Sequence, residues 1–250
     1  MTAAADGRPA AGGAAPPRLL LLTDRRRAAA AGRTLPATVA AAVRGGARAV
    51  VLREKDLPAA ERLGLARALR DVLDPVGGTL IVASDVDVAR RAGASGVHLA
   101  RAESPPAGTG LRLGRSCHDA AELAAAARLG LGYVTLSPVY ATSSKPGYGP
   151  ALTPFGRESP DPAHPWAADG GIAGLVAGTP DCPPVYALGG ITPERVGDCL
   201  AAGAYGVAVM GGVMGAADPE RVARELSAGL RAGIGPFQPR PDQDRSNAPR

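Results

Sequence analysis

The chain has 250 residues, of which 46% are hydrophobic and 20% are charged, and its formal net charge is +5. This length and apolar content predict one large globular domain with its own core. No apolar run approaches the roughly 20 residues of a membrane-spanning helix, and the first residues lack the basic-then-apolar pattern of a secretion signal. We therefore expect a cytoplasmic protein with no membrane partner.

The cysteines and the basic residues argue against two further classes. Cys117, Cys182 and Cys199 show no CxxC spacing, which argues against a zinc site or a disulfide framework. Much of the basic excess lies in Arg25 to Arg27 and in the last residues of the chain, without aromatic stacking partners nearby. We therefore expect no nucleic-acid partner.

Both ends of the chain lack a sustained hydrophobic pattern. Residues 1–17 are rich in Ala, Gly and Pro, and residues 236–250 offer little to bury. We expect disordered N- and C-terminal tails over these two ranges, on either side of one folded unit at 18–235.

Within this unit, short apolar runs alternate with amphipathic segments. Strands are predicted at 19–23, 47–53, 79–83, 96–99, 111–116, 133–136, 185–188 and 206–210, and helices at 57–73, 119–130 and 219–232. Asp119 is expected to open its helix, and Thr192 followed by Pro193 predicts another helix start.

The alternation of strands and helices predicts a parallel sheet. Eight β/α units in one domain fit a (β/α)8 TIM barrel better than an open doubly wound sheet, which carries a glycine-rich fingerprint after its first strand. Here the first strand is followed by TDRRR. A barrel has its active site at the carboxyl ends of its strands, so the functional residues are expected there.

Cations follow two of the predicted strands. Arg53 and Lys55 in LREK share strand parity, so both can point into one mouth and bind an anion; the alternative is a solvated pair on a loop. Lys145 follows a hydroxyl-rich run that contains Thr142 and Ser144. These residues are candidates for phosphate binding.

Two glycine pairs follow the last two strands. Gly189 and Gly190 precede a helix start, and Gly211 and Gly212 follow the eighth strand. Glycine lets backbone N–H groups approach a phosphate closely, and phosphate sites recur at these two strands in TIM barrels. Tight turns also use glycine, so each pair alone is a weak signal.

The string GRSCH at 114–118 ends the predicted fifth strand. Strand alternation puts Ser116 and His118 on the same side and Cys117 on the other, packed between strand and helix. His98 lies within GVHL and is expected to be a structural residue of the barrel.

Taken in order, the motifs LLLLTD, VVLREKD, GVHL, GRSCH, SPVYATSSKPGYGP, ALGGITPERV and GAYGVAVMGGV resemble the thiamine phosphate synthase/TenI family over about residues 19–230. The resemblance implies an enzyme of thiamine biosynthesis that binds a small-molecule thiazole phosphate. It also implies phosphate contacts by Arg53, Lys55, Ser116, Lys145, Gly189 and Gly190.

The synthases of this family join a hydroxymethylpyrimidine diphosphate to a thiazole phosphate, with Mg²⁺ on the leaving diphosphate. Their pattern has a glutamine before LREK, an Asn-Asp pair at the third strand end and an aspartate after GVHLGQE. This chain has Val51, Ala83, Ser84 and Glu103 there. Because Mg²⁺ prefers carboxylate oxygens, the changes favour loss of the metal site.

The resemblance therefore favours a metal-independent thiazole tautomerase of the TenI branch, an isomerase without a cofactor. In that branch, a histidine at the position of His118 transfers the proton, which suits a group that titrates near neutrality. The alternative is a diverged Mg²⁺-dependent thiamine phosphate synthase, a transferase in which Glu103 and Asp85 rebuild the metal site. A third interpretation is a non-catalytic thiazole phosphate sensor.

Two expectations concern the molecule's outline. The segment 146–165 is rich in Pro and Gly, and it is either a lid over the ligand or a flexible insertion. Barrels of this kind often pair through their outer helices, so a homodimer is the expected assembly if the chain has a protein partner.

Overall fold

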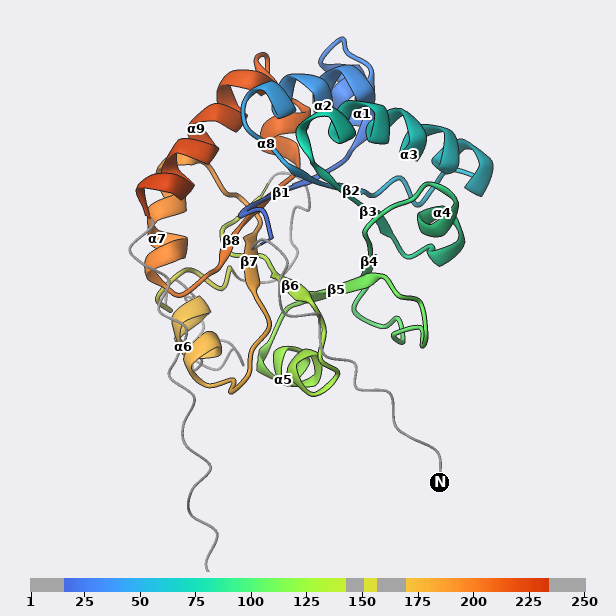
Figure 1. Cartoon of the computed structure of the whole chain (residues 1–250). Helices are drawn as coiled ribbons and strands as arrows, with labels where there is room; N and C mark the ends of the chain where they lie inside the picture. The colour runs from blue at the N-terminus through green and yellow to red at the C-terminus, as the bar shows by residue number, and fades with distance from the viewer. Residues whose placement is uncertain (1–15, 143–150, 157–169, 234–250) are drawn as a thin grey trace, which may run out of the picture.

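The computed structural model describes residues 16–142, 151–156 and 170–233. Its parallel strands pair in chain order and close into a barrel, because β8 pairs with β1. Figure 1 shows the ring of strands viewed approximately down the barrel axis. The strands are β1 (Leu19–Leu22), β2 (Ala49–Leu52), β3 (Thr79–Ala83), β4 (Gly96–Leu99), β5 (Arg112–Cys117), β6 (Tyr133–Leu136), β7 (Val185–Leu188) and β8 (Gly206–Val209).

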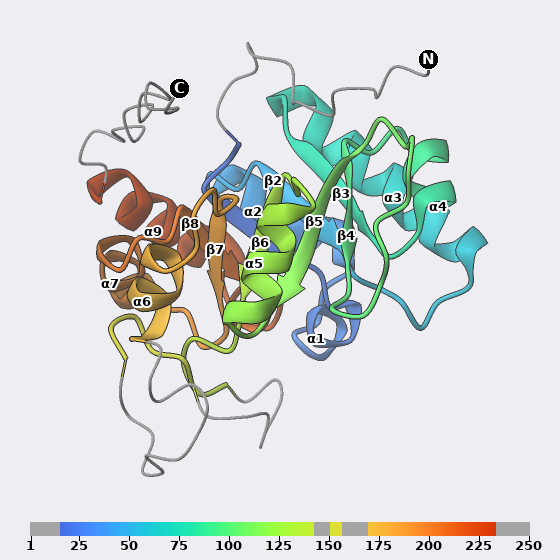
Figure 2. The ribbon, with the colours of Figure 1, turned by 90° about the horizontal axis from the view of Figure 1, so that it is seen from below.

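Helices surround the ring, so the fold is a TIM barrel, as the sequence predicts (Figure 1). They are α1 (Arg25–Ala30), α2 (Leu35–Arg44), α3 (Ala59–Leu73), α4 (Val86–Arg91), α5 (Ala120–Arg128), α6 (Gly171–Ala177), α7 (Val196–Ala201), α8 (Gly211–Met214) and α9 (Pro219–Ala232). Figure 2 shows the barrel from the side, with α1, which follows the carboxyl end of β1, at the bottom.

The connection between β4 and β5 differs from the expected repeat of eight β/α units. Residues 100–111 are described throughout and contain no helix. This segment includes Pro105, Pro106, Gly108 and Gly110, residue types that disfavour a helix interior.

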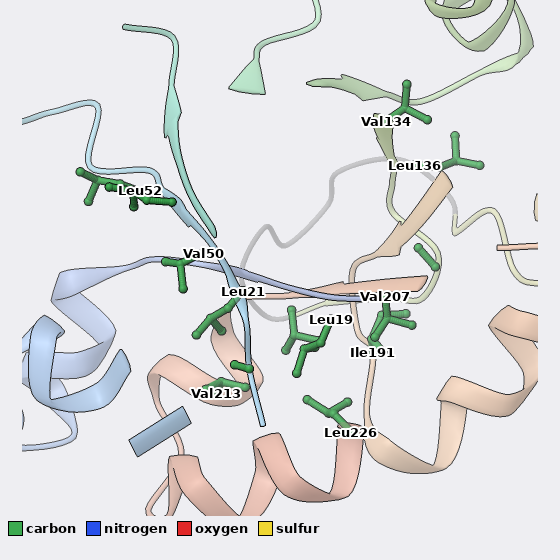
Figure 3. Close-up of a cluster of buried hydrophobic side chains, with 14 of the residues drawn as sticks. Leu19, Leu21, Val50, Leu52, Val134, Leu136, Ile191, Val207, Val213 and Leu226 are labelled. Atoms are coloured by element: carbon green, nitrogen blue, oxygen red, sulfur yellow. The ribbon is translucent and has the colours of Figure 1, made fainter. Parts of the chain in front are cut away.

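The main hydrophobic core lies between the strands and the helices. Leu19 and Leu21 of β1 face outward into it, as do Val50 and Leu52 of β2. Figure 3 shows Leu19 and Leu21 packed in a cluster that also holds Val213 and Leu226 from α8 and α9. Alternate residues of the same strands therefore face the inside of the barrel.

The barrel interior has its own core of aliphatic and tyrosine side chains. Leu20, Ile81 and Tyr133 belong to it. A Cβ atom on Gly114 of β5 would lie 2.1 Å from the ring of Tyr133 on the neighbouring strand β6. Glycine at this position is therefore what lets the tyrosine ring fit inside.

Of the two predicted helix starts, Asp119 caps a helix with its side chain and Thr192 does not. Asp119 is the N-cap of α5, and its carboxylate accepts a hydrogen bond from the backbone of Glu122 at 2.8 Å, which confirms the prediction. Thr192 instead precedes the 3-10 turn Pro193–Arg195 and makes no side-chain cap hydrogen bond. The α-helix α7 begins only after that turn.

The predicted tails fall almost entirely outside the described residues, which begin at Pro16 and end at Gly233. Pro16 and Pro17 accept hydrogen bonds from the hydroxyls of Tyr205 and Tyr186. None of the helices in the described part of the chain has the length and apolar character needed to cross a membrane.

Candidate functional site

The charged side chains in the segment after β2 alternate between two environments, with Glu54 in one and Arg53 and Lys55 in the other. Glu54 is buried, and its carboxylate forms an ion pair with Arg25 of α1 at 2.9 Å. The backbone N–H of Arg53 donates to the hydroxyl of Thr23 at 2.8 Å, which ties the segment to the end of β1. Arg53 and Lys55 lie close enough to His98, inside the barrel, to lower its pKa. The positive charges of Arg53 and Lys55 therefore both lie near the mouth of the barrel.

Glu103 is the centre of a polar cluster at this mouth. One of its carboxylate oxygens accepts hydrogen bonds from the Ser84 hydroxyl and from the backbone N–H of Ala100, both at 2.8 Å. Its other oxygen lies 3.6 Å from the ammonium of Lys55. Burial opposes ionisation of Glu103, but the bonds from Ser84 and Ala100, together with Lys55, hold its pKa below the usual value. The carboxylate is therefore ionised at neutral pH.

Ser84 reaches Glu103 through an unusual backbone conformation. Its φ is +60°, in the left-handed region that few non-glycine residues adopt. The backbone N–H of Ser84 donates to the carbonyl of His98 at 3.0 Å, which holds the residue beside β4. Such strain is found mostly at functional sites, where neighbouring contacts maintain it.

His98 connects the interior of the barrel to Ser116. Its Nδ1 lies 2.9 Å from the Tyr133 hydroxyl, and its Nε2 lies 2.9 Å from the Ser116 hydroxyl. Burial, followed by the charge of Lys55, lowers the pKa of His98 to about 4, and Arg53 acts in the same direction against Glu103. The imidazole is thus neutral, and it holds Ser116 in place, which agrees with the structural role expected of His98.

His118 lies at the turn between β5 and α5. Its Nδ1 is 3.0 Å from a carboxylate oxygen of Glu122, and its backbone N–H donates to the same oxygen at 2.8 Å. Arg101 forms an ion pair with Glu122 as well. These contacts hold His118 against α5.

The expectation that Ser116 and His118 point to the same side assumed that the strand continues through position 118. Strand alternation places Ser116 inside the barrel, but β5 ends at Cys117, so the alternation does not extend to position 118. Cys117 is fully buried in the layer between strands and helices, as expected. Burial, and next the charge of Glu122, raise the pKa of this thiol to about 12.

The glycine pair after β7 packs closely against the loop that follows β6. Gly189 and Gly190 have φ values of +103° and +63°, which favour glycine. A Cβ atom on Gly190 would lie 2.6 Å from the carbonyl oxygen of Ala141. The backbone N–H of Tyr140 donates to the carbonyl of Gly189 at 3.0 Å. These glycines are therefore needed to bring two loops of the mouth together.

The remaining phosphate candidates have different positions. Gly211 and Gly212 begin the short helix α8 directly after β8. Thr142 is the last described residue before the first undescribed stretch of the loop after β6. Ser144 and Lys145 fall outside the described residues, and of the predicted lid or insertion at 146–165 only residues 151–156 are described.

The metal pair required by the synthase alternative is not assembled from Glu103 and Asp85. The Asp85 carboxylate caps α4 by accepting from the backbone of Val88 at 2.9 Å, and it forms an ion pair with Arg62 at 2.6 Å. Across the described ranges, no group of three or more His, Cys, Asp or Glu side chains is arranged to hold a metal ion. The expectation for Asp85 was wrong because the residue serves as a helix cap.

Two features of the site were missed by the sequence analysis. The first is the convergence of Lys55 and Ser84 on Glu103, which could have been found from the adjacency of β2, β3 and β4 in the predicted barrel. The second is Tyr133, whose hydroxyl completes the hydrogen bonds of His98. The sequence signal for Tyr133 is weaker. Gly114 makes room for the Tyr133 ring, but this can be recognised only once the two residues are known to be paired on neighbouring strands.

A closed parallel barrel with charged and hydroxyl groups gathered at the carboxyl ends of its strands defines a TIM-barrel enzyme. The thiamine monophosphate synthase family matches residues 19–213. The chain therefore belongs to this family, and it is an enzyme of thiamine biosynthesis.

Individual relatives agree with this assignment. The chain is 42% identical over 204 residues to a putative thiamine-phosphate synthase of Geobacter sulfurreducens, covering 79% of this chain and 87% of that protein. It is 38% identical over 206 residues to the thiamine-phosphate synthase of Xanthobacter autotrophicus, covering 80% and 90%. Among solved structures, thiamine phosphate pyrophosphorylase from Pyrococcus furiosus superposes with a TM-score of 0.72 at 26% identity, covering 87% and 97%.

These names favour the transferase alternative over the isomerase expected from the motifs. The contact of the His118 imidazole with Glu122 does not choose between the two reactions, because a carboxylate on Nδ1 also orients histidines that transfer protons. None of the three relatives named above is a tautomerase.

Proposed function

We propose that the chain is a thiamine-phosphate synthase, which joins a hydroxymethylpyrimidine diphosphate to a thiazole phosphate and releases diphosphate. The observation that carries the proposal is the cluster of Lys55, Glu103 and Ser84 at the mouth, with Arg53 beside it. The names of the relatives support the same reaction.

The reaction places new charge on the leaving group. The new bond forms at the carbon that carries the diphosphate, so the diphosphate departs with the bonding electron pair. Lys55 and Arg53 neutralise the charge that develops on its oxygens, and fixed cations in a partly enclosed site stabilise such a transition state. Ser116 is held by His98 and offers its hydroxyl as a further contact to the substrate.

The donor set suits a Mg²⁺ ion that arrives with the diphosphate. Mg²⁺ is often held by one or two carboxylates together with substrate phosphates. Glu103 supplies one ionised carboxylate, and the Ser84 hydroxyl lies 2.8 Å from it as a second oxygen donor. When bound, the ion would neutralise charge on the diphosphate. Because Glu103 also faces Lys55, the protein alone offers an incomplete set of ligands.

The pyrimidine side of the site departs from the family pattern. Val51 stands where that pattern has glutamine, and it is fully buried in the barrel interior. A valine side chain has no hydrogen-bonding group. We propose that other groups of the mouth bind the polar edge of the pyrimidine.

The test supplies both substrates with Mg²⁺ to the full chain. Thiamine phosphate and diphosphate should appear in equal amounts. Lys55→Met should lower turnover by about 100-fold or more, because it removes a cation from the charge that develops at the leaving group. The matched control is Arg221→Met, a cation on the exposed side of α9, which should retain the parent rate.

Other outcomes decide between the alternatives. Isomerisation of the thiazole tautomer without formation of thiamine phosphate would support the tautomerase, and it would contradict the proposal. Binding of thiazole phosphate with neither activity would support the sensor and would contradict it as well. Equal rates for Lys55→Met and Arg221→Met would remove Lys55 from the mechanism.

A further inference from the structure

A cavity of about 660 Å³ opens at the amino-terminal end of the barrel, opposite the mouth. Its wall includes the first residues of three strands, Thr79 of β3, Arg112 of β5 and Tyr133 of β6. Leu20 and Ile81 from the barrel interior also line it. Because parallel strands all begin at the same end, this cavity is separate from the candidate active site.

The polar lining of the cavity is cationic. Arg48 and Arg112 line it, and no Asp or Glu is among the described residues of its wall. The guanidinium of Arg48 is fixed by hydrogen bonds to the carbonyls of Val43 and Ala47, both at 2.8 Å. The backbone N–H of Arg112 donates to the carbonyl of Ser95 at 3.1 Å, but within the described residues its exposed guanidinium has no hydrogen-bond or ion-pair partner. Arg112 is therefore available to an anion.

One wall of the cavity is aromatic. The rings of Tyr133 and Tyr186 have centroids 5.6 Å apart and lie edge to face at 80°. The Tyr186 hydroxyl donates to the carbonyl of Pro17 at 2.7 Å, which fixes the direction of its ring. Burial raises the pKa of both tyrosines, and Arg112 acts against this rise in both, so its positive charge lies close to these rings.

We propose that this cavity is a second ligand site, which takes a small planar aromatic anion. Its volume lies within the range of small-molecule sites, about 300–1,000 Å³. The tyrosine rings and the aliphatic side chains suit a planar apolar body, and Arg112 suits a carboxylate or phosphate group. The proposal does not depend on which reaction occurs at the mouth.

Tyr133 gives the site a reporter at the centre of the barrel. Its ring lines the cavity, and its hydroxyl lies 2.9 Å from Nδ1 of His98. The other ring nitrogen of His98 lies 2.9 Å from the hydroxyl of Ser116, on the side of the mouth. A ligand that packs against Tyr133 should therefore shift the NMR signals of the His98 imidazole.

The test titrates the full chain with 2-naphthoate, and with 2-naphthalenemethanol as the neutral probe of similar shape. Calorimetry should show saturable binding of the carboxylate, at least tenfold tighter than binding of the alcohol. Arg112→Gln should weaken carboxylate binding by tenfold or more. Arg128→Gln changes an exposed arginine in the last turn of α5 and should leave it unchanged.

The site of binding is checked by competition and by spectroscopy. Saturating inorganic diphosphate should not displace the naphthoate, and naphthoate should shift the signals of ¹⁵N-labelled His98. Displacement by diphosphate would place the probe at the mouth and overturn the proposal. Equal binding of acid and alcohol, equal effects of the two arginine variants, or no binding at millimolar probe would overturn it too.

Discussion

His98 shows how a single buried side chain can set the geometry of a site. Both of its ring nitrogens have hydroxyl partners, on Tyr133 and Ser116. A neutral imidazole has one donor and one acceptor nitrogen, so the two hydroxyls complete its hydrogen bonds without any charge. A protonated His98 would have two donors and would lie near the positive charges of Lys55 and Arg53.

We predict that His98 makes folding stability depend on pH in the acidic range. Its pKa of about 4 in the folded state lies below the usual value near 6.5, so the unfolded chain binds more protons between these two values. The contribution of His98 to the free energy of unfolding should be fully present above pH 6.5. It should be lost as the pH drops towards 4, by on the order of 3 kcal/mol. Urea unfolding followed between pH 7 and 4.5 measures the effect.

The matched variant is His98→Gln, which keeps polar atoms at this position but does not titrate. Its unfolding free energy should change less between pH 7 and 4.5 than that of the parent chain. An NMR titration gives a direct check, because His98 should remain neutral at pH 5.5. Titration of His98 near pH 6.5 would contradict the account.

At the scale of elements, the caps explain why polar residues at several strand ends lie outside the candidate site. Asp24, Asp85 and Asp119 each lie two residues after the end of a strand, and each caps the next helix. A cap carboxylate accepts a hydrogen bond from an otherwise unpaired N–H group of the first helical turn. Polar residues at strand ends therefore divide into caps and residues of the mouth, such as Lys55.

We predict that Asp119→Ala destabilises the protein by about 1 kcal/mol, within the range of 0.5–2 kcal/mol for the loss of an N-cap. The variant loses the hydrogen bond from the backbone of Glu122 at the start of α5. Chemical denaturation measures the change. Asp71→Ala, an exposed position within α3, is the control and should stay within about 0.5 kcal/mol of the parent. Equal stability of the two variants would contradict the capping role.

The same distinction explains what the sequence could predict. Apolar runs such as 19–23 and 133–136 predicted the strands, because a buried parallel strand needs a nearly continuous apolar sequence. The expectation that Arg53 and Lys55 point to the same side followed from alternation over three residues, and the charges of both act on His98. The position of His118 did not follow, because the strand ends before it and Glu122 of α5 binds its ring.

Other parts of the site depend on the closed barrel. A serine in the sequence does not indicate a left-handed backbone, so the conformation of Ser84 could not be predicted. Its contact with Glu103 joins the ends of neighbouring strands, which come together only in the closed barrel. The helix-free connection at 100–111 was hidden by the regular repeat around it, although its prolines and glycines gave a local signal. The motifs predicted the family, but the choice of reaction depended on substitutions whose surroundings the sequence does not show.

At the scale of the whole molecule, the barrel has two ends with different chemistry. The carboxyl end gathers Arg53, Lys55 and Glu103, whereas the amino end holds Arg112 beside the tyrosine rings. Tyr133 and His98 connect the two ends through the interior. The leaving diphosphate is expected to lie at the carboxyl end, beside Lys55.

The most direct measurement is a crystal structure of the full chain with thiamine phosphate, diphosphate and Mg²⁺. We predict diphosphate oxygens within hydrogen-bonding distance of the Lys55 ammonium, and the ion between the diphosphate and the Glu103 carboxylate. Diphosphate bound away from Lys55, with Glu103 in contact with neither diphosphate nor ion, would contradict the account.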